Sequence, residues 1–390
     1  SFSLLSGNAR IPATLALFLY ALDGSNGITM AWIANRNALL STAAALGAFL
    51  FFMQQRQQNN LFDWRGPLTF LVALLCAEYG ISLLALIFSY ALMLDKAPAR
   101  DRVLSLLPYA VVLGLWAWFY RSQGFGTHDS GMYLDPVRQT GQYLMALPER
   151  LLLLINAQLN AIPIVVQPHT EAVSRFHLEF AVFILILLAP TLIRSANARF
   201  YLLAAVLSLL PVAAAYPEDR VLLFSGFGFM GLLAEFFLTW FSKENRPRFP
   251  KPINFVYGAF TWLFLLIHAV ISPLSFTLTY QVPFNSSHKL IDTPALALPY
   301  DDSIKDKTAI FINPPIAMLG SYFTAVRLVH QLPVPAYTYF LTSSRGENLY
   351  ERVDANSIRV TPETGFFQSD FDYYPRSPDK LFKAGDRLHL

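Results

Sequence analysis

Long apolar runs separated by short polar connections make up most of the chain before residue 280. A helix needs about 20 mostly apolar residues to cross a bilayer, and eight runs approach or exceed that length. The runs are 11–22, 28–53, 67–94, 103–120, 178–193, 200–215, 221–241 and 255–274. The pattern predicts an all-α polytopic membrane domain over residues 1–280.

The basic connections between the runs predict how the domain is oriented. Lys and Arg gather in short loops on the cytoplasmic side of a membrane. In this chain they gather in four connections: 54–66, 95–102, 194–199 and 242–251. If all four connections face the cytoplasm, four other segments lie on the opposite side of the membrane: 23–27, a large loop 121–177, 216–220, and everything after Leu274.

This alternation requires run 67–94 to enter and leave on the same side. The run is too long for one upright helix and short for two, and Glu78 and Gly80 interrupt it. We therefore expect a tight hairpin with Glu78 near its outer turn. A single steep span at this place would invert every later element.

The predicted orientation brings several acids, a histidine and an arginine to the outer face: Asp23, Glu78, His128, Asp129, Asp135, Glu218, Asp219 and Arg220. Charges near lipid are costly, so such residues favour a functional interpretation. In the alternative, Asp219 and Arg220 simply form a water-exposed turn. The segment 147–166, "LPERLLLLINAQLNAIPIVV", predicts a helix that lies in the interface or packs under the outer loop.

Composition agrees with a membrane protein, because 54% of residues are hydrophobic and 14% are charged, against about 25% charged in a soluble domain. The only cysteine, Cys76, excludes a disulfide framework and a Cys-based zinc site. Lys and Arg are scattered, which argues against nucleic acid as a partner. His128 and Asp129 could bind a divalent cation or exchange a proton, but two adjacent residues do not make a metal site.

The character of the chain changes after Gln281. Strand-like stretches appear at 307–315, 336–344 and 357–362, and a helix pattern follows Asn313. We expect residues 285–390 to form a soluble extracytoplasmic domain, α+β or mostly β. The chain opens in mid-pattern and closes on "LFKAGDRLHL", so we expect both ends to be truncated.

Three stretches together resemble the polytopic GT-C-type glycosyltransferases, especially the tetratricopeptide-linked O-mannosyltransferase-like membrane proteins. They are "AWIANRNALLS" (31–41), "LLCAEYGISLLALIFSYALMLD" (74–95) and "PEDRVLLFSGFGFMGLLA" (217–234). The chain departs from the family at Ala77, where the family has Lys, and at Val221, where it has Tyr. The first outer loop, which carries the family's catalytic acid, lies upstream of residue 1 or is absent, and no tetratricopeptide repeats follow.

The resemblance implies a GT-C-like helical bundle that transfers a sugar from a polyprenyl-phosphate donor to an acceptor at the extracytoplasmic face. It implies that the carboxylates of Asp219, Glu78 and Asp129 are catalytic or shape the acceptor site. Whether the reaction also uses a divalent cation is left open. It likewise implies substrate-binding residues, with a guanidinium facing the lipid phosphate: Arg220, Arg36, His128 and Asp23. Membrane lipids and the lipid-linked donor would be the partners, and a bacterial inner membrane the location.

Three alternatives remain open. Arg36, about 13 Å into its run at about 1.5 Å per residue, could instead form a buried ion pair with Glu78. The whole protein could be a non-enzymatic scaffold that presents the C-terminal domain for binding or assembly. A transporter is less favoured, because few polar residues lie midway along the runs.

Overall fold

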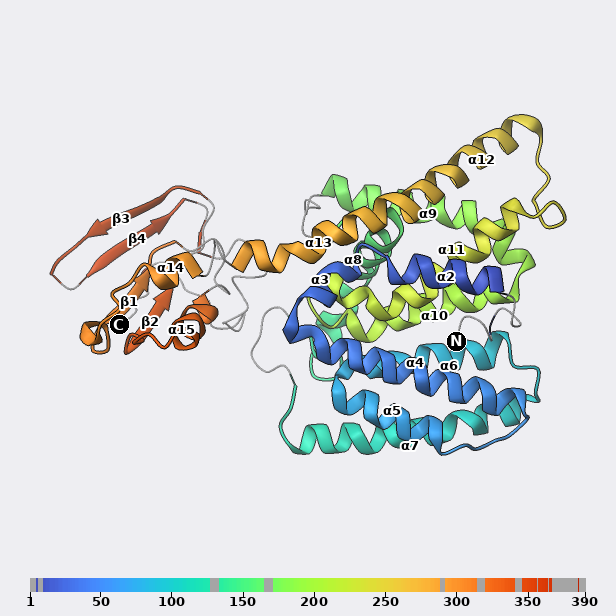
Figure 1. Ribbon diagram of the computed structural model, residues 1–390, viewed down its shortest axis with the longest axis horizontal. Helices are drawn as coiled ribbons and strands as arrows, with labels where there is room; N and C mark the ends of the chain where they lie inside the picture. Colours follow the sequence, from blue (N-terminus) through green and yellow to red (C-terminus); the bar gives the residue numbers. More distant parts are fainter. Residues whose placement is uncertain are drawn as a thin grey trace. The chain divides into compact units, whose positions relative to one another are not determined.

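The computed structural model describes Leu5 and residues 10–126, 133–164, 171–287, 292–313, 320–340, 346–355, 357–363, 365–366 and 385 (Figure 1). The chain divides into two compact units. Unit 1 is Ser1–Gly126 with Gly141–Val282, and unit 2 is Thr127–Thr140 with Pro283–Leu390.

Unit 1 is a helical bundle. Its main helices are α2 (Arg10–Ala21), α3 (Asn26–Ala31), α4 (Arg36–Gln57), α5 (Arg65–Cys76), α6 (Leu83–Met93), α7 (Ala99–Ser122), α8 (Thr140–Asn160), α9 (Glu171–Arg194), α10 (Ala196–Val212), α11 (Leu223–Phe241), α12 (Lys251–Leu266) and α13 (Ser272–Ser287). Five helical segments are long and apolar enough to cross a membrane: Ile33–Gln57, Ala99–Ser122, Val173–Arg194, Asp219–Phe241 and Lys251–Gln281. They confirm the predicted helical membrane domain as far as length and composition test it.

The core of unit 1 is built around α11, whose residues from Leu223 to Ala234 are all buried. A helix that is apolar on every side belongs inside a bundle, and α11 packs against α10 and α2. Gly228 allows the close approach to α10, because a Cβ at this position would lie 2.8 Å from the backbone oxygen of Tyr201. The aromatic residues of α11 are therefore mainly core residues.

The predicted hairpin over 67–94 is confirmed. The chain leaves α5 at Ala77, which is extended (φ −166°, ψ 156°), turns through the 3₁₀ helix η2 (Glu78–Ser82) and returns as α6. Arg56 near the end of α4 forms a 2.7 Å ion pair with Asp95, just beyond α6. Because a short loop also joins α4 to the start of α5, both arms of the hairpin open at the same end of the bundle (Figure 1).

The bundle consequently has two chemically different ends. We call one the basic end, because the four predicted basic connections lie there, at the helix termini around Gln57, Leu94, Arg194 and Phe241. Arg194 Nη1 donates to the Asn245 carbonyl at 2.9 Å, which ties two of these connections together. We call the opposite end, where α2 leads into Asp23 and η4 (Asp219–Leu222) leads into α11, the carboxylate end.

Three predicted elements need correction. The run 28–53 is not one helix, because Trp32 is extended and the 3₁₀ helix η1 (Ile33–Asn35) separates α3 from α4. The last run does not stop at 274. A π-helical turn, η5 (Ile267–Ile271), joins α12 to α13, and the helix continues to Ser287. The helix predicted over 147–166 exists as α8, but it begins earlier and packs on the bundle, where Arg150 donates to the carbonyls of 213–215.

Unit 2 contains two small sheets. The strands β1 (Thr308–Phe311) and β2 (Tyr337–Phe340) pair in parallel and are connected through α15 (Gly320–Val329). The strands β3 (Asn348–Arg352) and β4 (Ile358–Pro362) form an antiparallel hairpin. A strand lies within each of the three predicted stretches, of which residues 314–315 and 341–344 lie outside the described residues. The predicted strand–helix half unit is completed by β2. The strand β3 was not predicted from the sequence.

Arg327 in α15 organises this unit. Its side chain is fully buried and donates to four backbone carbonyls, those of Ala295, Leu298, Pro299 and Pro333, at 2.6–3.4 Å. The first three lie in or just after the short helix α14 (Thr293–Leu296), and the fourth lies before β2. A single guanidinium therefore holds α14, α15 and the approach to β2 together.

Candidate functional site

A buried carboxylate, Asp23, lies at the carboxylate end in the turn between α2 and α3. Its side chain accepts hydrogen bonds from the Ser25 backbone at 3.2 Å, the Ser25 hydroxyl at 2.9 Å and the Ser272 hydroxyl at 3.4 Å. The Gln158 amide of α8 donates a further, short hydrogen bond. Three elements distant in sequence thus converge on one carboxylate that is only 2% exposed.

The surroundings of Asp23 alter its acidity. Burial raises the pKa of Asp23 from 3.8 to about 6, and the hydrogen bonds from Ser25, Gln158 and Ser272 oppose this rise. Removal from water disfavours the charged form, whereas donated hydrogen bonds favour it. Asp23 can therefore gain or lose a proton close to neutral pH.

A second buried carboxylate, Asp219, opens the 3₁₀ helix that leads into α11. It is 7% exposed, and its two oxygens accept from the Ile164 backbone N–H at 3.2 and 3.1 Å. The negative charges of Asp23 and Glu218 act on Asp219 directly. Within the described part of the chain, neither Asp23 nor Asp219 has a basic partner within ion-pair distance.

Arg220 lies beside this pair and is more accessible. Its guanidinium forms an ion pair with Glu218 and stacks 5.3 Å from the centre of the Trp32 ring. The side chain of Arg220 is 23% exposed and that of Glu218 is 27% exposed. Burial raises the pKa of Glu218, and the charge of Arg220 opposes that rise. The Arg220 carbonyl accepts from the Tyr79 hydroxyl at 2.8 Å, which fixes the hairpin turn against η4.

The structure brings together only some of the predicted site residues. Asp23, Asp219 and Arg220 gather at the carboxylate end, and the burial of Asp219 contradicts the alternative of a water-exposed turn at this residue. Glu78 lies at the predicted hairpin turn, but it is exposed and accepts a short hydrogen bond from Tyr120 of α7. His128 and Asp129 lie outside the described residues.

Arg36 lies at the start of its candidate span, Ile33–Gln57, and not two turns inside it. The break at Trp32 places it at the first residue of α4, where it is exposed. Among the described residues no ion pair joins Arg36 to Glu78. The alternative of a buried Arg36–Glu78 pair is therefore wrong, because the helix begins later than the apolar pattern suggested.

Several polar residues of the site were missed by sequence reasoning. Gln158 is buried within the apolar stretch of α8, and its Oε1 has no hydrogen-bond partner among the described residues. Trp32 and Ser272 contribute the stacking surface and a hydroxyl. A polar amide in the middle of "LLLLINAQLNAI" was the signal that could have identified Gln158, because buried polar groups need partners.

The described residues contain no group of three or more His, Cys, Asp or Glu side chains placed to hold a metal ion. The candidate site therefore consists of two buried carboxylates that interact electrostatically, Asp23 and Asp219, with the guanidinium of Arg220 and the ring of Trp32. Such a set can exchange a proton at the carboxylates and hold an anion at the guanidinium.

Comparison of the chain with protein-family models, with curated proteins and with solved structures finds no match. The resemblance of 31–41, 74–95 and 217–234 to GT-C enzymes therefore rests on those residues alone.

Proposed function

We propose that this protein is a GT-C-type membrane glycosyltransferase, which transfers a sugar from a polyprenyl-phosphate donor to an acceptor hydroxyl at the extracytoplasmic face. The adjacency of Asp23, Asp219 and Arg220 at the end of the bundle opposite the basic connections supports this proposal most directly. The positive-inside rule places that end outside the cytoplasm, where a lipid-linked donor and a secreted acceptor could meet. On the same assignment, the protein resides in a bacterial inner membrane.

Asp219 is the proposed general base. It is the more exposed of the two buried carboxylates, and Arg220 follows it directly in the chain. Asp219 would take the proton of the acceptor hydroxyl while the acceptor oxygen bonds to the sugar's anomeric carbon. The bond from that carbon to the phosphate oxygen breaks, and its electron pair leaves with the polyprenyl phosphate. A positioned base contributes about 10²–10⁴-fold to such a step.

Asp23 is the proposed positioning residue. Its four hydrogen bonds join the α2–α3 turn to α8 and α13. It is too deeply buried to touch an acceptor in this arrangement. The negative charge of Asp23 nevertheless acts on Asp219. Protonation of Asp23 would therefore change how readily Asp219 accepts a proton.

Arg220 is the proposed phosphate ligand. A guanidinium has five N–H donors in a planar fork, so it can keep its ion pair with Glu218 and still bind a phosphate oxygen. The Trp32 ring holds the guanidinium in place from one face. Arg is suited to phosphate because the fork matches two of its oxygens.

The activity is tested with the full chain in proteoliposomes that contain radiolabelled polyprenyl-phosphate sugars and an extracytoplasmic membrane-protein extract as acceptor. Transfer of label by the wild type, with loss of at least 100-fold in Asp219→Asn and Arg220→Ala, is the expected result. Asp63→Asn, which removes an acid at the basic end, serves as the matched control and should transfer normally. Wild-type rates in both site variants would contradict the proposal.

A non-enzymatic scaffold that presents unit 2 is the second candidate. The observation that favours it is that the site's charges are already engaged within the protein, Arg220 with Glu218 and Asp219 with the Ile164 N–H. In this case the wild type transfers no sugar from any donor tested, while the site variants remain folded.

The orientation is tested separately by cysteine labelling in a Cys76→Ala background. Cysteines at the exposed positions 78 and 65 should react with a membrane-impermeant maleimide from opposite sides of intact cells. Labelling of both from the same side would overturn the assignment of the carboxylate end to the outer face.

A further inference from the structure

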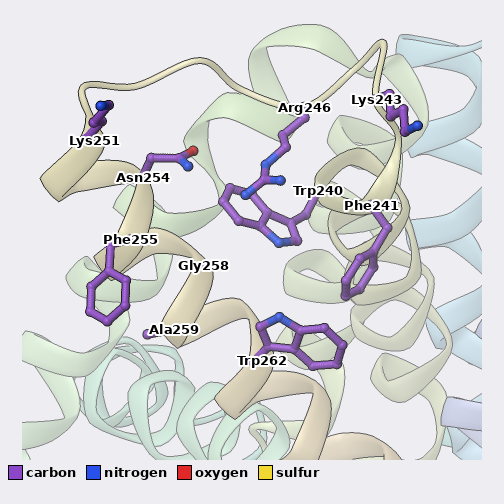
Figure 2. Close-up of a pocket in the computed structure, with 10 residues that line it drawn as sticks. All are labelled: Trp240, Phe241, Lys243, Arg246, Lys251, Asn254, Phe255, Gly258, Ala259 and Trp262. Carbon is purple, nitrogen blue, oxygen red and sulfur yellow. The ribbon is translucent and has the colours of Figure 1, made fainter.

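The basic end of the bundle contains a cavity of about 600 Å³ between the end of α11, the loop 242–250 and the first turns of α12 (Figure 2). Its polar rim carries Lys243, Arg246 and Lys251. Its lining also contains the aromatic side chains of Trp240, Trp262 and Phe255. Neither the predicted site residues nor the proposed sugar transfer involves this cavity.

The three cations of the rim are not neutralised by neighbouring acids. Within the described ranges, none of them forms an ion pair with a carboxylate, and no carboxylate lines the cavity. Elsewhere at this end a basic residue is neutralised, since Arg56 pairs with Asp95. The rim therefore presents a concentrated positive charge to any anion that enters.

Arg246 is held in position for binding. Its guanidinium lies 3.8 Å from the centre of the Trp240 ring, and Figure 2 shows the side chain reaching across that ring. Trp240 is 4% exposed and packs against Tyr257, with ring centres 5.0 Å apart. A guanidinium stacked on a fixed ring keeps its in-plane N–H donors free for an anion.

The aromatic lining continues into the membrane-spanning part of α12. Phe255 is 77% exposed and Trp262 is 59% exposed, and both project from the helix that contains a candidate span. Trp262 packs edge-on against Phe241, with ring centres 5.1 Å apart. Tryptophan is enriched at the level where a bilayer meets water. The cations of the rim would therefore lie at the level of the lipid headgroups, and the exposed aromatic side chains at the level where the acyl chains begin.

We propose that this cavity binds an anionic glycerophospholipid. The phosphodiester lies between Arg246 and Lys251, and an acyl chain lies along Trp262 and Ala259. An inorganic anion would use the rim but not the aromatic lining, and a zwitterionic lipid would bring its own cation against the rim. A pocket that combines both surfaces therefore fits a ligand with a net negative headgroup and an apolar tail. This proposal is independent of the sugar-transfer activity.

The full chain is purified in a neutral detergent and offered dioleoyl phosphatidylglycerol or dioleoyl phosphatidylcholine, and bound lipid is counted by native mass spectrometry. We expect the wild type to retain at least fivefold more phosphatidylglycerol than phosphatidylcholine. The double variant Arg246→Gln/Lys251→Gln should lose this preference. The control, Lys96→Gln/Arg100→Gln, removes two exposed cations from another connection of the same end and should keep it.

A steric variant makes the test independent of charge. Ala259 is exposed on the cavity wall, so Ala259→Trp should fill the acyl channel and lower phosphatidylglycerol retention at least fivefold, with the net charge unchanged. Gel filtration and circular dichroism check that each variant is folded. Equal retention of the two lipids by the wild type, equal loss in the Lys96/Arg100 control, or displacement of the lipid by millimolar inorganic phosphate would each overturn the proposal.

Discussion

The Nε atom of Arg56 lies 2.7 Å from a carboxylate oxygen of Asp95, and both side chains are almost fully buried, at 1% and 5% exposure. Arg56 Nη1 also donates to the Asn60 carbonyl at 2.7 Å. This ion pair joins the end of α4 to the chain just after α6 at the basic end of the bundle.

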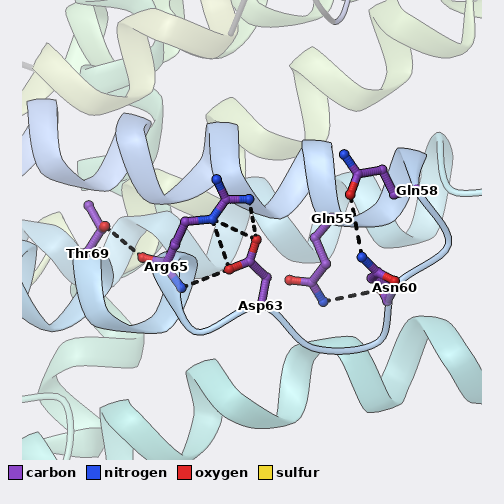
Figure 3. A network of polar contacts seen from close by, with 6 residues as sticks. All are labelled: Gln55, Gln58, Asn60, Asp63, Arg65 and Thr69. Atoms are coloured by element: carbon purple, nitrogen blue, oxygen red, sulfur yellow. Dashed lines mark hydrogen bonds and ion pairs between the residues drawn. The ribbon is translucent and has the colours of Figure 1, made fainter.

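Asp95→Ala should strongly destabilise unit 1, because it leaves the Arg56 charge buried without its partner. Breaking a buried pair costs about 3–5 kcal/mol, and we expect a decrease of that size in the free energy of unfolding, measured by titration with a denaturing detergent in mixed micelles. The control is Asp63→Ala, which removes a pair with Arg65 in the α4–α5 loop (Figure 3). The Arg65 side chain is 45% exposed, so this change should cost less than about 1 kcal/mol. Equal losses in the two variants would contradict a structural role for the buried pair.

Gly228→Ala should disrupt the packing of α11 on α10. The added Cβ would lie 2.8 Å from the Tyr201 oxygen and the Ala205 nitrogen, and backbone atoms cannot move aside as a flexible side chain can. Overpacking of this kind costs about 1–3 kcal/mol, and small residues permit close helix contacts in membranes. Gly114→Ala, in α7 with no atom within 4 Å of the new Cβ, should stabilise instead by up to about 1 kcal/mol. Thermal unfolding in detergent distinguishes the two, and a Gly228→Ala protein as stable as the wild type would contradict the packing.

The sequence predicted the helical domain, the hairpin and three strands because each depends on a local signal: an apolar run, a polar interruption or β-branched alternation. Prediction from the sequence failed where tertiary contacts determine the break in a helix or the burial of a side chain. The break at Trp32 interrupts an apolar run without a proline, and the chain there bends to place Trp32 under the Arg220 guanidinium. Gln158 and Ser272 reach Asp23 from α8 and α13, and no spacing within one segment could show that convergence. The buried Arg36–Glu78 pair, one of the alternatives left open for Arg36, is wrong for the same reason, because the burial of a side chain is decided by the assembled bundle.

Arg327→Ala should unfold or loosen unit 2. Four carbonyls lose their donor together, and hydrogen bonds to charged groups each contribute about 1.5–3 kcal/mol. We expect a loss of at least about 3 kcal/mol, detected as faster hydrogen exchange in α15 and β2, with unit 1 unchanged. Arg352→Ala is the matched control, because Arg352 is exposed and, among the described residues, its side chain donates to the carbonyls of its own turn. Unchanged exchange in the Arg327 variant would show that the buried guanidinium is dispensable.

Asp23 should give the protein a characteristic dependence of stability on pH. Its folded-state pKa of about 6 is higher than the ordinary 3.8, so between about pH 4 and 6 the folded state holds more protons than the unfolded state. The contribution of Asp23 to the free energy of unfolding is therefore fully present at low pH and is lost as pH rises through that window. The loss is on the order of 3 kcal/mol. Glu218, whose pKa is also raised by burial, acts in the same direction.

Asp23→Asn tests this contribution, because asparagine cannot ionise. Its single amide oxygen, in the place of Oδ2, can still accept from the Gln158 amide and the Ser25 hydroxyl, but its NH2 group cannot accept from the Ser25 backbone N–H. The variant should show a shallower loss of stability between pH 4 and 6 and should be more stable than the wild type at pH 8, in detergent-based unfolding titrations. Asp63→Asn should leave that slope intact, because the pKa of Asp63 is lowered by its contact with Arg65 and its proton is lost below the window. An unchanged slope of stability in Asp23→Asn would mean that the carboxylate is ionised throughout, and that the buried pair does not store a proton near neutral pH.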